Sequence, residues 1–368
     1  MKKKLLMLVS PRGDAMVRDA FDLAVQMRDD FEILVLASND AKGRFREAGI
    51  RCDVWRAGGI IGMGIAVSRL RRTVTKFKPD LIHTHGLPAC AVALGTFPAS
   101  LCWRTVSTFH DPQRDKELPQ KLVERKLPGY LRRAAHLCAT YPTLARALEK
   151  RLLLDDNAIE VIPHGVAVPL DGSSPLGRPA TRPGPVVGWR GYLSADRSWE
   201  TAIDAFAKLR ETFPHARMEV AGSGRARNFV VAHARQLKLS KFVNFRGDVP
   251  AAELFANIDV LAVPISNDAQ PQAPLEALVA GVPVVAALAT ALRDAIEPLE
   301  TGWLVPDDTP GFVDGIGDAW GKIDAAWAGA AAQRSVARAL YGRDVVGARY
   351  REIYEAVLAR SPDVGYRT

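Results

Sequence analysis

Short apolar runs alternate with longer amphipathic stretches throughout the first half of the chain. The longer stretches place apolar residues three or four positions apart, which predicts helices, and the short runs predict buried strands. Strands that alternate with helices in this way are typical of a doubly wound parallel sheet. The predicted strands of this half are Leu5–Val9, Ile33–Ala37, Cys52–Trp55, Leu81–Thr84, Thr105–Phe109, Leu137–Ala139 and Glu160–Ile162.

A second series of the same kind follows a stretch rich in Pro, Gly and Ser, from Pro169 to Pro185. Such a shift in composition marks a linker, and 368 residues exceed the length of a typical single core. We therefore expect an α/β protein with an N-terminal Rossmann-like domain (1–168), a hinge linker (169–184), a C-terminal Rossmann-like domain (185–343) and a final helix (344–368), with a cleft between the domains. The strands predicted for the second domain are Val186–Gly188, Met218–Ala221, Val243–Phe245, Val260–Val263, Val282–Ala286 and Trp303–Val305.

Composition narrows the class of protein. Hydrophobic residues make up 48% and charged residues 24%, as in ordinary globular proteins, and the net charge of +8 favours anionic partners. We expect no nucleic acid among them, because zinc-finger spacings and RNP motifs are missing. The four cysteines form no CxxC pair, which predicts free buried thiols in a reducing compartment. Since no apolar run is long enough for a signal peptide or a membrane span, we expect a cytoplasmic protein.

Two stretches of the first half are basic. Between Asp53 and Asp80 the chain has no acidic residue, and its apolar residues from Ile60 to Phe77 form one helical stripe. The region from Arg114 to Arg133 is a second basic stretch. Two interpretations remain open: the stripe packs on the sheet while the basic face is solvated, or the face contacts anionic lipid at the inner side of a membrane.

Candidate ligand residues follow the predicted strands, because parallel sheets bind ligands beyond the carboxyl ends of their strands. Gly13, in the loop after the first strand, could let the backbone approach a phosphate, although a single glycine in a turn more often serves only the turn. His110 directly follows the fifth strand. This position favours it as a site residue over His83 and His85, which end the previous strand, although a lone histidine is usually structural.

The segment from Asp259 to Ala286 predicts a buried strand, a polar loop, a short helix with Pro274 at its first position and a second buried strand. Unpaired N–H groups at the start of such a helix form an anion site. Asp268 in the loop and Glu276 in the helix bracket this place. A single carboxylate early in a helix usually only compensates the helix dipole, whereas a pair followed by GVPVVA is more specific.

The order of these motifs resembles the retaining glycosyltransferase family 4 of the GT-B fold, over nearly the whole chain. The resemblance implies transfer of a hexose-type sugar from a nucleotide-sugar donor to a hydroxyl of a glycan, lipid-linked or small-molecule acceptor. The N-terminal domain would take the acceptor, the C-terminal domain the donor, and the last helix would cross back onto the first domain. The motifs are STFHDP, VIPHGV, VVGWRG, Arg197 with the WETAIDAF that follows it, MEVAGSG, FVNFRGDV and the Asp268–Glu276 pair with GVPVVA.

The resemblance also implies roles for individual residues. Arg190 and Arg197 would stabilise the charge that grows on the β-phosphate of the leaving group. Asp268 would lie near the transferred sugar, and His110 would contact its hydroxyls. The remaining donor-binding residues would be Glu276 at the ribose, Val249 at the base, and Gly13, Gly222 and Leu275.

This chain departs from the family at several positions. Arg197 replaces a lysine and lies farther from the preceding arginine than is usual, Asp268 replaces a glutamate, and His164 replaces the asparagine of the hinge motif. Pro271 and Pro274 remove two N–H donors near the phosphates.

We expect no cofactor and no metal, since the family transfers sugars without one. Two alternatives stay open. One is a non-catalytic, nucleotide-sugar-binding subunit of a glycosylation complex, which the changes around Asp268 would favour. The other is a nucleotide-sugar epimerase of the same architecture, and the order of the motifs argues against it.

Overall fold

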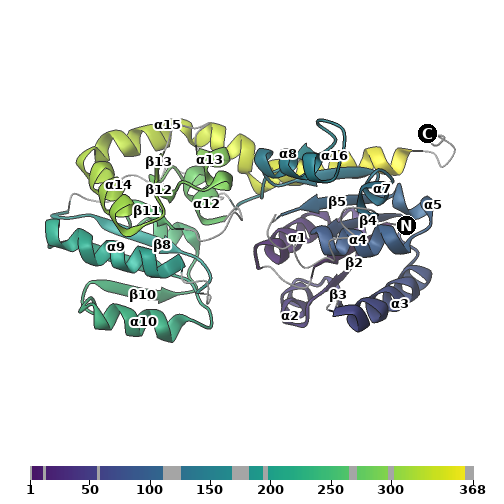
Figure 1. Cartoon of the computed structure of the whole chain (residues 1–368), viewed down its shortest axis with the longest axis horizontal. Coiled ribbons are helices and arrows are strands. Elements are labelled where there is room, and N and C mark those ends of the chain that lie inside the picture. Colours follow the sequence, from purple (N-terminus) through teal and green to yellow (C-terminus); the bar gives the residue numbers. More distant parts are fainter. Residues whose placement is uncertain are drawn as a thin grey trace. The chain divides into compact units, whose positions relative to one another are not determined.

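The computed structural model describes residues 2–10, 14–55, 59–110, 126–167, 182–193, 198–264, 272–296 and 302–360 (Figure 1). The chain divides into two compact units. The first unit comprises Met1–Gly165 with Arg343–Thr368, and the second comprises Val166–Gly342. Each unit contains one parallel sheet, which confirms the predicted fold class. Most of the predicted hinge linker lies outside the described residues.

The first unit is built on a seven-stranded parallel sheet with the order β3-β2-β1-β4-β5-β6-β7. The order reverses at β1, whose neighbours are β2 and β4, and ligand sites of doubly wound sheets lie at such a switch point. The strands are β1 (Lys3–Val9), β2 (Phe31–Ala37), β3 (Arg51–Val54), β4 (Leu81–His85), β5 (Thr105–Phe109), β6 (His136–Ala139) and β7 (Glu160–Val161).

The helices of this unit bury the apolar faces that the sequence pattern predicted. In α3, Ala66, Leu70 and Phe77 are buried, while Arg69, Arg71, Arg72 and Lys76 are exposed. The described part of the stripe, which includes Leu70 and Phe77, therefore packs on the protein, as in the first of the two interpretations. The helices are α1 (Asp14–Met27), α2 (Asn39–Glu47), α3 (Gly59–Phe77), α4 (Leu87–Thr96), α5 (Ala99–Cys102), α7 (Leu127–Leu131) and α8 (Pro142–Arg151).

The last helix, α16 (Arg343–Ala359), belongs to the first unit, as the resemblance implied. Tyr354 and Tyr350 of α16 are fully buried. The Tyr354 hydroxyl lies 2.6 Å from Nδ1 of His83, and the Tyr350 hydroxyl lies 2.9 Å from the hydroxyl of Thr108. These contacts attach the helix to the central strands β4 and β5.

The second unit contains a six-stranded parallel sheet with the order β10-β9-β8-β11-β12-β13. Its order reverses at β8, which pairs with β9 and β11. The strands are β8 (Val186–Arg190), β9 (Arg217–Ala221), β10 (Val243–Gly247), β11 (Val260–Val263), β12 (Val284–Ala287) and β13 (Gly302–Val305).

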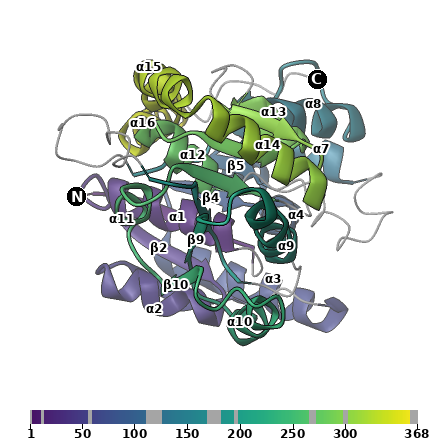
Figure 2. The same ribbon diagram turned by 90° about the vertical axis from the view of Figure 1, so that its left-hand side faces the viewer.

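The helices of the second unit cover this sheet, and α9 and α14 lie side by side (Figure 2). The helix that follows β11 begins at Gln272, two residues earlier than predicted. Pro274 is compatible with this start because the first N–H groups of a helix lack intrahelical partners. The helices are α9 (Ser198–Thr212), α10 (Arg227–Gln236), α11 (Ala251–Phe255), α12 (Gln272–Ala280), α13 (Thr290–Ile296), α14 (Thr309–Gly321) and α15 (Ile323–Tyr341).

All four cysteines are buried and free, as predicted. Among the described residues, no helix is both long and apolar enough to cross a membrane.

Candidate functional site

Polar side chains gather at the carboxyl ends of β4 and β5 in the first unit. His83 is a satisfied core residue, because its ring nitrogens contact the hydroxyls of Tyr354 and Thr108 at 2.6 and 2.8 Å. His85 lies at the end of β4, and its Nδ1 is 3.2 Å from Nε2 of His110. His110 itself is only 4% exposed. The predicted site residue therefore lies in a buried row of histidines.

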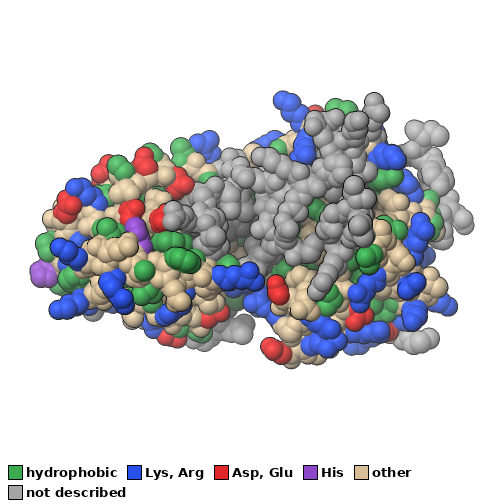
Figure 3. Space-filling view, turned by 60° about the horizontal axis from the view of Figure 1, so that its bottom comes forward, with side chains coloured by type: hydrophobic (Ala, Val, Ile, Leu, Met, Phe, Trp, Pro, Cys, Tyr) green, Lys and Arg blue, Asp and Glu red, His purple; other side chains and the backbone are tan. Residues whose placement is uncertain are grey.

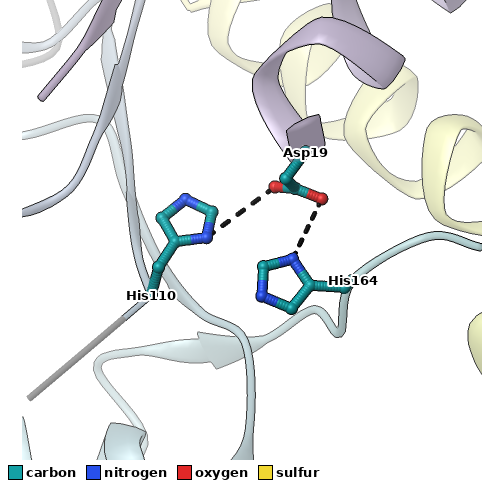
Figure 4. Close-up of side chains that lie close together, drawn as sticks. All are labelled: Asp19, His110 and His164. Carbon is teal, nitrogen blue, oxygen red and sulfur yellow. Dashed lines mark ion pairs between the residues drawn. The ribbon is translucent and has the colours of Figure 1, made fainter. Parts of the chain in front are cut away.

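A carboxylate that the sequence analysis missed completes this group. Asp19 of α1 is buried, with Oδ1 3.2 Å from Nδ1 of His164 and Oδ2 3.9 Å from Nδ1 of His110 (Figure 4). One signal in the sequence could have revealed it. Asp19 lies among Met16, Ala20 and Leu23, on the apolar stripe of an amphipathic helix, where an acidic residue is unusual.

Burial sets the charges in this group. Burial alone would raise the pKa of Asp19, but attraction to His164, His110 and His85 holds that pKa well below its usual range. Burial lowers the pKa of both His85 and His110 well below its ordinary value. An ionised carboxylate therefore lies beside rings whose neutral forms are favoured. Asp19, His110 and His164 each offer one ligand atom, all within 4.8 Å of one another, so these three residues could hold a metal ion.

In the second unit, one predicted catalytic residue, Arg190, lies in contact with two predicted donor-binding residues, Val249 and Glu276. Arg190, at the end of β8, donates from Nε to Oε2 of Glu276 at 2.9 Å. It also donates from Nη1 to the carbonyl of Val249 at 2.8 Å. Both charged side chains are largely buried, at 13% and 12% exposure. Arg190 thus joins the carboxylate of α12 to the chain that follows β10.

Gly222, also predicted for the donor site, has a packing role in this unit. Its φ is +145°, and a Cβ there would lie 1.9 Å from the carbonyl oxygen of Gly191. The Gly222 N–H donates to the carbonyl of Gly247 at 2.7 Å. The glycine therefore lets the chains that leave β8, β9 and β10 approach closely. Leu275 is fully buried in the hydrophobic core, so its side chain faces protein.

The remaining predicted site residues, Gly13, Arg197 and Asp268, lie outside the described residues. Of the two proposed phosphate-binding arginines, only Arg190 has a described position.

Basic side chains cover α3 on the surface of the first unit. Figure 3 shows Lys and Arg side chains gathered along the edge of this unit that carries α2 and α3. The exposed residues of α3 include Arg69, Arg71, Arg72 and Lys76, and Ile65 near its start is 62% exposed.

Comparison with known proteins identifies both units. Residues 16–168 match the family model described as Glycosyltransferase Family 4, and residues 184–321 match that described as Glycosyl transferases group 1. The chain is 28% identical to the 2-deoxystreptamine glucosyltransferase of Streptomyces kanamyceticus over 168 residues, which are 42% of this chain and 43% of that protein. The match thus spans less than half the length of this relative.

Solved structures extend the similarity to the whole fold. HepE of Anabaena in complex with UDP superposes with a TM-score of 0.77 and 20% identity, over 96% of this chain and 100% of that chain. Sucrose-phosphate synthase of Thermosynechococcus elongatus gives a TM-score of 0.73 with 17% identity, over 98% and 100%. With both units matched by glycosyltransferase models and the fold shared throughout, the chain belongs to glycosyltransferase family 4 and has the GT-B fold.

Proposed function

We propose that the protein is a retaining glycosyltransferase that moves a hexose-type sugar from a nucleotide-sugar donor to a hydroxyl of a glycan, lipid-linked or small-molecule acceptor. The observation that carries this proposal is the contact of Arg190 with Glu276 and Val249. The resemblance assigned these residues separately to the diphosphate, the ribose and the base, and they meet at the carboxyl edge of one sheet. Structures of HepE with UDP and with UDP-glucose support a nucleotide-sugar as the donor.

The chemistry follows from these side chains. Glu276 would accept hydrogen bonds from ribose hydroxyls, while Arg190 fixes the orientation of its carboxylate. The bond between the sugar C1 and the diphosphate oxygen breaks, and the nucleoside diphosphate leaves with the electron pair. A bond from the acceptor oxygen to C1 forms on the same face of the sugar, and the acceptor hydroxyl gives its proton to the departing diphosphate oxygen. The guanidinium of Arg190 stabilises the leaving charge electrostatically, so the proposed transfer needs no metal bridging the phosphates.

Thermal unfolding with a panel of UDP-, GDP-, ADP- and dTDP-sugars tests the donor. A ligand that binds only the folded protein raises the midpoint of thermal unfolding. At a ligand concentration a hundred times the dissociation constant, it adds about 2.7 kcal/mol to the free energy of unfolding. Stabilisation by sugars of one base would fix the donor class. A folded protein that no member of the panel stabilises would contradict the proposal.

A variant then tests the site. Glu276→Ala should weaken nucleotide binding roughly tenfold to a hundredfold, because hydrogen bonds to a charged group contribute about 1.5–3 kcal/mol. Glu219→Gln is the matched control, since Glu219 also pairs with an arginine, Arg246, in the same sheet. Equal loss of affinity in both variants would remove Glu276 from the site.

Product analysis separates the alternatives. With the donor identified, NMR of the anomeric centre before and after transfer should show the same configuration. Tight nucleotide-sugar binding without transfer to any acceptor offered would instead favour the non-catalytic subunit.

The basic face of α3 is the proposed contact with a membrane surface, which would place the protein in the cytoplasm at an anionic membrane. The protein should co-sediment with vesicles that contain phosphatidylserine and not with phosphatidylcholine vesicles. Replacing Arg69, Arg71 and Arg72 by glutamine should abolish the binding, because each basic residue near the surface contributes about 1 kcal/mol. Co-sedimentation that survives these replacements would exclude this face.

A further inference from the structure

Asp19, His110 and His164 form a compact group, here called the triad, within the first unit (Figure 4). They come from α1, from the end of β5 and from the segment after β7. One oxygen of Asp19 is 3.2 Å from Nδ1 of His164, and the other is 3.9 Å from Nδ1 of His110. Three segments far apart in the sequence thus each bring one ligand atom to within 4.8 Å of the other two.

The two nitrogens that face Asp19 have no well-aligned hydrogen-bond partner within the described part of the chain. Among the described residues, Nδ1 of His110 and Nδ1 of His164 are buried and accept or donate no hydrogen bond of acceptable geometry. His110 is 4% exposed and His164 is 1% exposed, so bulk water does not solvate either ring. A buried polar atom without a partner is costly, and two beside one carboxylate need an explanation.

The other nitrogen of His110 shows how this ring could act as a ligand. Nε2 of His110 lies 3.2 Å from Nδ1 of His85. When Nε2 donates in this contact, Nδ1 of His110 carries a lone pair and turns it toward the carboxylate. A lone pair and a carboxylate repel each other unless a cation lies between them. Histidines that bind metals characteristically donate from the other ring nitrogen to a protein acceptor in this way.

We propose that Asp19, His110 and His164 bind one divalent transition metal ion, with Zn²⁺ as the best fit, through the carboxylate of Asp19 and the two Nδ1 atoms. Two histidines and one carboxylate are an established ligand set for Zn²⁺, with bonds of about 2.0–2.2 Å. Ligand atoms at two corners of such a tetrahedron lie about 3.3 Å apart. Oδ1 of Asp19 already lies 3.2 Å from Nδ1 of His164, whereas Nδ1 of His110 lies 3.9 Å from Oδ2. Closing the site therefore requires either that the His110 ring moves toward Oδ1 or that both oxygens bind the ion.

The donor atoms also select the ion. Imidazole nitrogen favours Zn²⁺ and its neighbours in the first transition row over Mg²⁺ and Ca²⁺, which prefer oxygen. The bound ion would neutralise Asp19 and tie α1 to the segments after β5 and β7. It would also occupy Nδ1 of His110 while Nε2 stays on His85, so metal binding and contact with a donor sugar compete for this ring.

Metal binding can be measured without knowing the donor or the acceptor. The full-length protein, purified without a polyhistidine tag and freed of metal by a chelator, is titrated with Zn²⁺ by calorimetry. We expect saturable binding of one Zn²⁺ per chain and a higher midpoint of thermal unfolding when the ion is bound. Co²⁺ in place of Zn²⁺ should give the visible absorption of an ion bound by nitrogen and oxygen.

Two variants identify the ligands. Asp19→Asn and His164→Asn should each weaken Zn²⁺ binding by roughly a hundredfold or more, since loss of an outer partner alone costs about 10–100-fold. His136→Asn is the matched control, because His136 also pairs with a carboxylate of the first unit, Glu160, at 2.7 Å. This control should bind Zn²⁺ like the unaltered protein.

Three results would overturn the proposal. The first is a folded, unaltered protein that takes up no Zn²⁺ or Co²⁺, in which case a proton between Asp19 and His164 balances the charge. The second is binding that survives both triad variants, and the third is binding that His136→Asn abolishes. Because titration of the unaltered protein shows by itself whether the ion binds, a variant that fails to fold does not leave the question open. None of these results bears on nucleotide binding by the second unit.

Discussion

The pairing of Arg190 with Glu276 gives Arg190 a structural role beside the chemical role proposed for it. Its side chain is largely buried and joins the carboxylate to the carbonyl of Val249. Arg190→Ala should lower the free energy of unfolding by about 3 kcal/mol, because Glu276 then keeps a buried charge without its cation. Urea denaturation measures this loss.

A double-mutant cycle tests whether the loss comes from the pair. Arg190→Ala combined with Glu276→Ala should cost less than the sum of the single variants, because the orphaned charge is gone. Strict additivity would show that the two side chains contribute separately and that the contact is energetically minor.

Asp22 should make stability depend on pH. Burial raises the pKa of this carboxyl from 3.8 to about 6, although Arg343 lies 3.0 Å away. The folded state therefore binds the proton more tightly than the unfolded state does. This contribution to stability is complete below about pH 4 and is lost as the pH rises through about 6.

The variant Asp22→Asn isolates this effect. Between about pH 3.5 and pH 7 the free energy of unfolding of the unaltered protein should fall by roughly 3 kcal/mol relative to the variant. Chemical denaturation of both proteins across this range measures the difference. Parallel pH profiles would mean that Arg343 cancels the effect of burial.

At the scale of elements, the strands were predictable because strands of parallel sheets are buried on both faces and form continuous apolar runs. The first residue of β12 was not predictable in this way, because a local hydrogen bond at the end of α12 determines it. Gly281 has φ +75°, and the N–H of Val282 donates back to the carbonyl of Ala277, so Val282 still belongs to the turn that ends α12 and the strand begins two residues later than predicted. Motifs were enough to predict Glu276 and Val249 as site residues, whereas the position of Asp19 beside His164 depends on packing between distant segments.

The turn after β9 offers a test of packing at the donor site. Gly222→Ala should lower the free energy of unfolding by at least about 2 kcal/mol, because the methyl group meets the backbone oxygen of Gly191 and φ is +145°. Gly329→Ala in α15 is the control, where nothing lies within 4 Å of the added carbon. This control should gain up to about 1 kcal/mol. Equal stability of the two variants would show that the turn relaxes freely.

At the scale of the molecule, each unit has a hydrophobic core of its own, and α16 carries the end of the chain back into the core of the first unit. The proposed nucleotide site uses residues of the second unit only, and the proposed metal site uses residues of the first unit only. Binding of the nucleotide alone and of Zn²⁺ can therefore be tested separately in one intact protein, whereas a nucleotide-sugar whose sugar contacts His110 should compete with Zn²⁺.

Hydrogen exchange monitored by mass spectrometry should separate the two sites. The nucleotide that the thermal panel selects should slow exchange most in the turn after β9 and in α12, because the proposed nucleotide site lies beside Gly222 and Glu276. Zn²⁺ should instead slow exchange in α1 and at the end of β5, which it ties together through Asp19 and His110. Local opening governs exchange in such segments, so a ligand protects the segments that it holds. If the nucleotide protected α1 and left α12 unchanged, the donor would be bound by the first unit and the role proposed for Glu276 would be wrong.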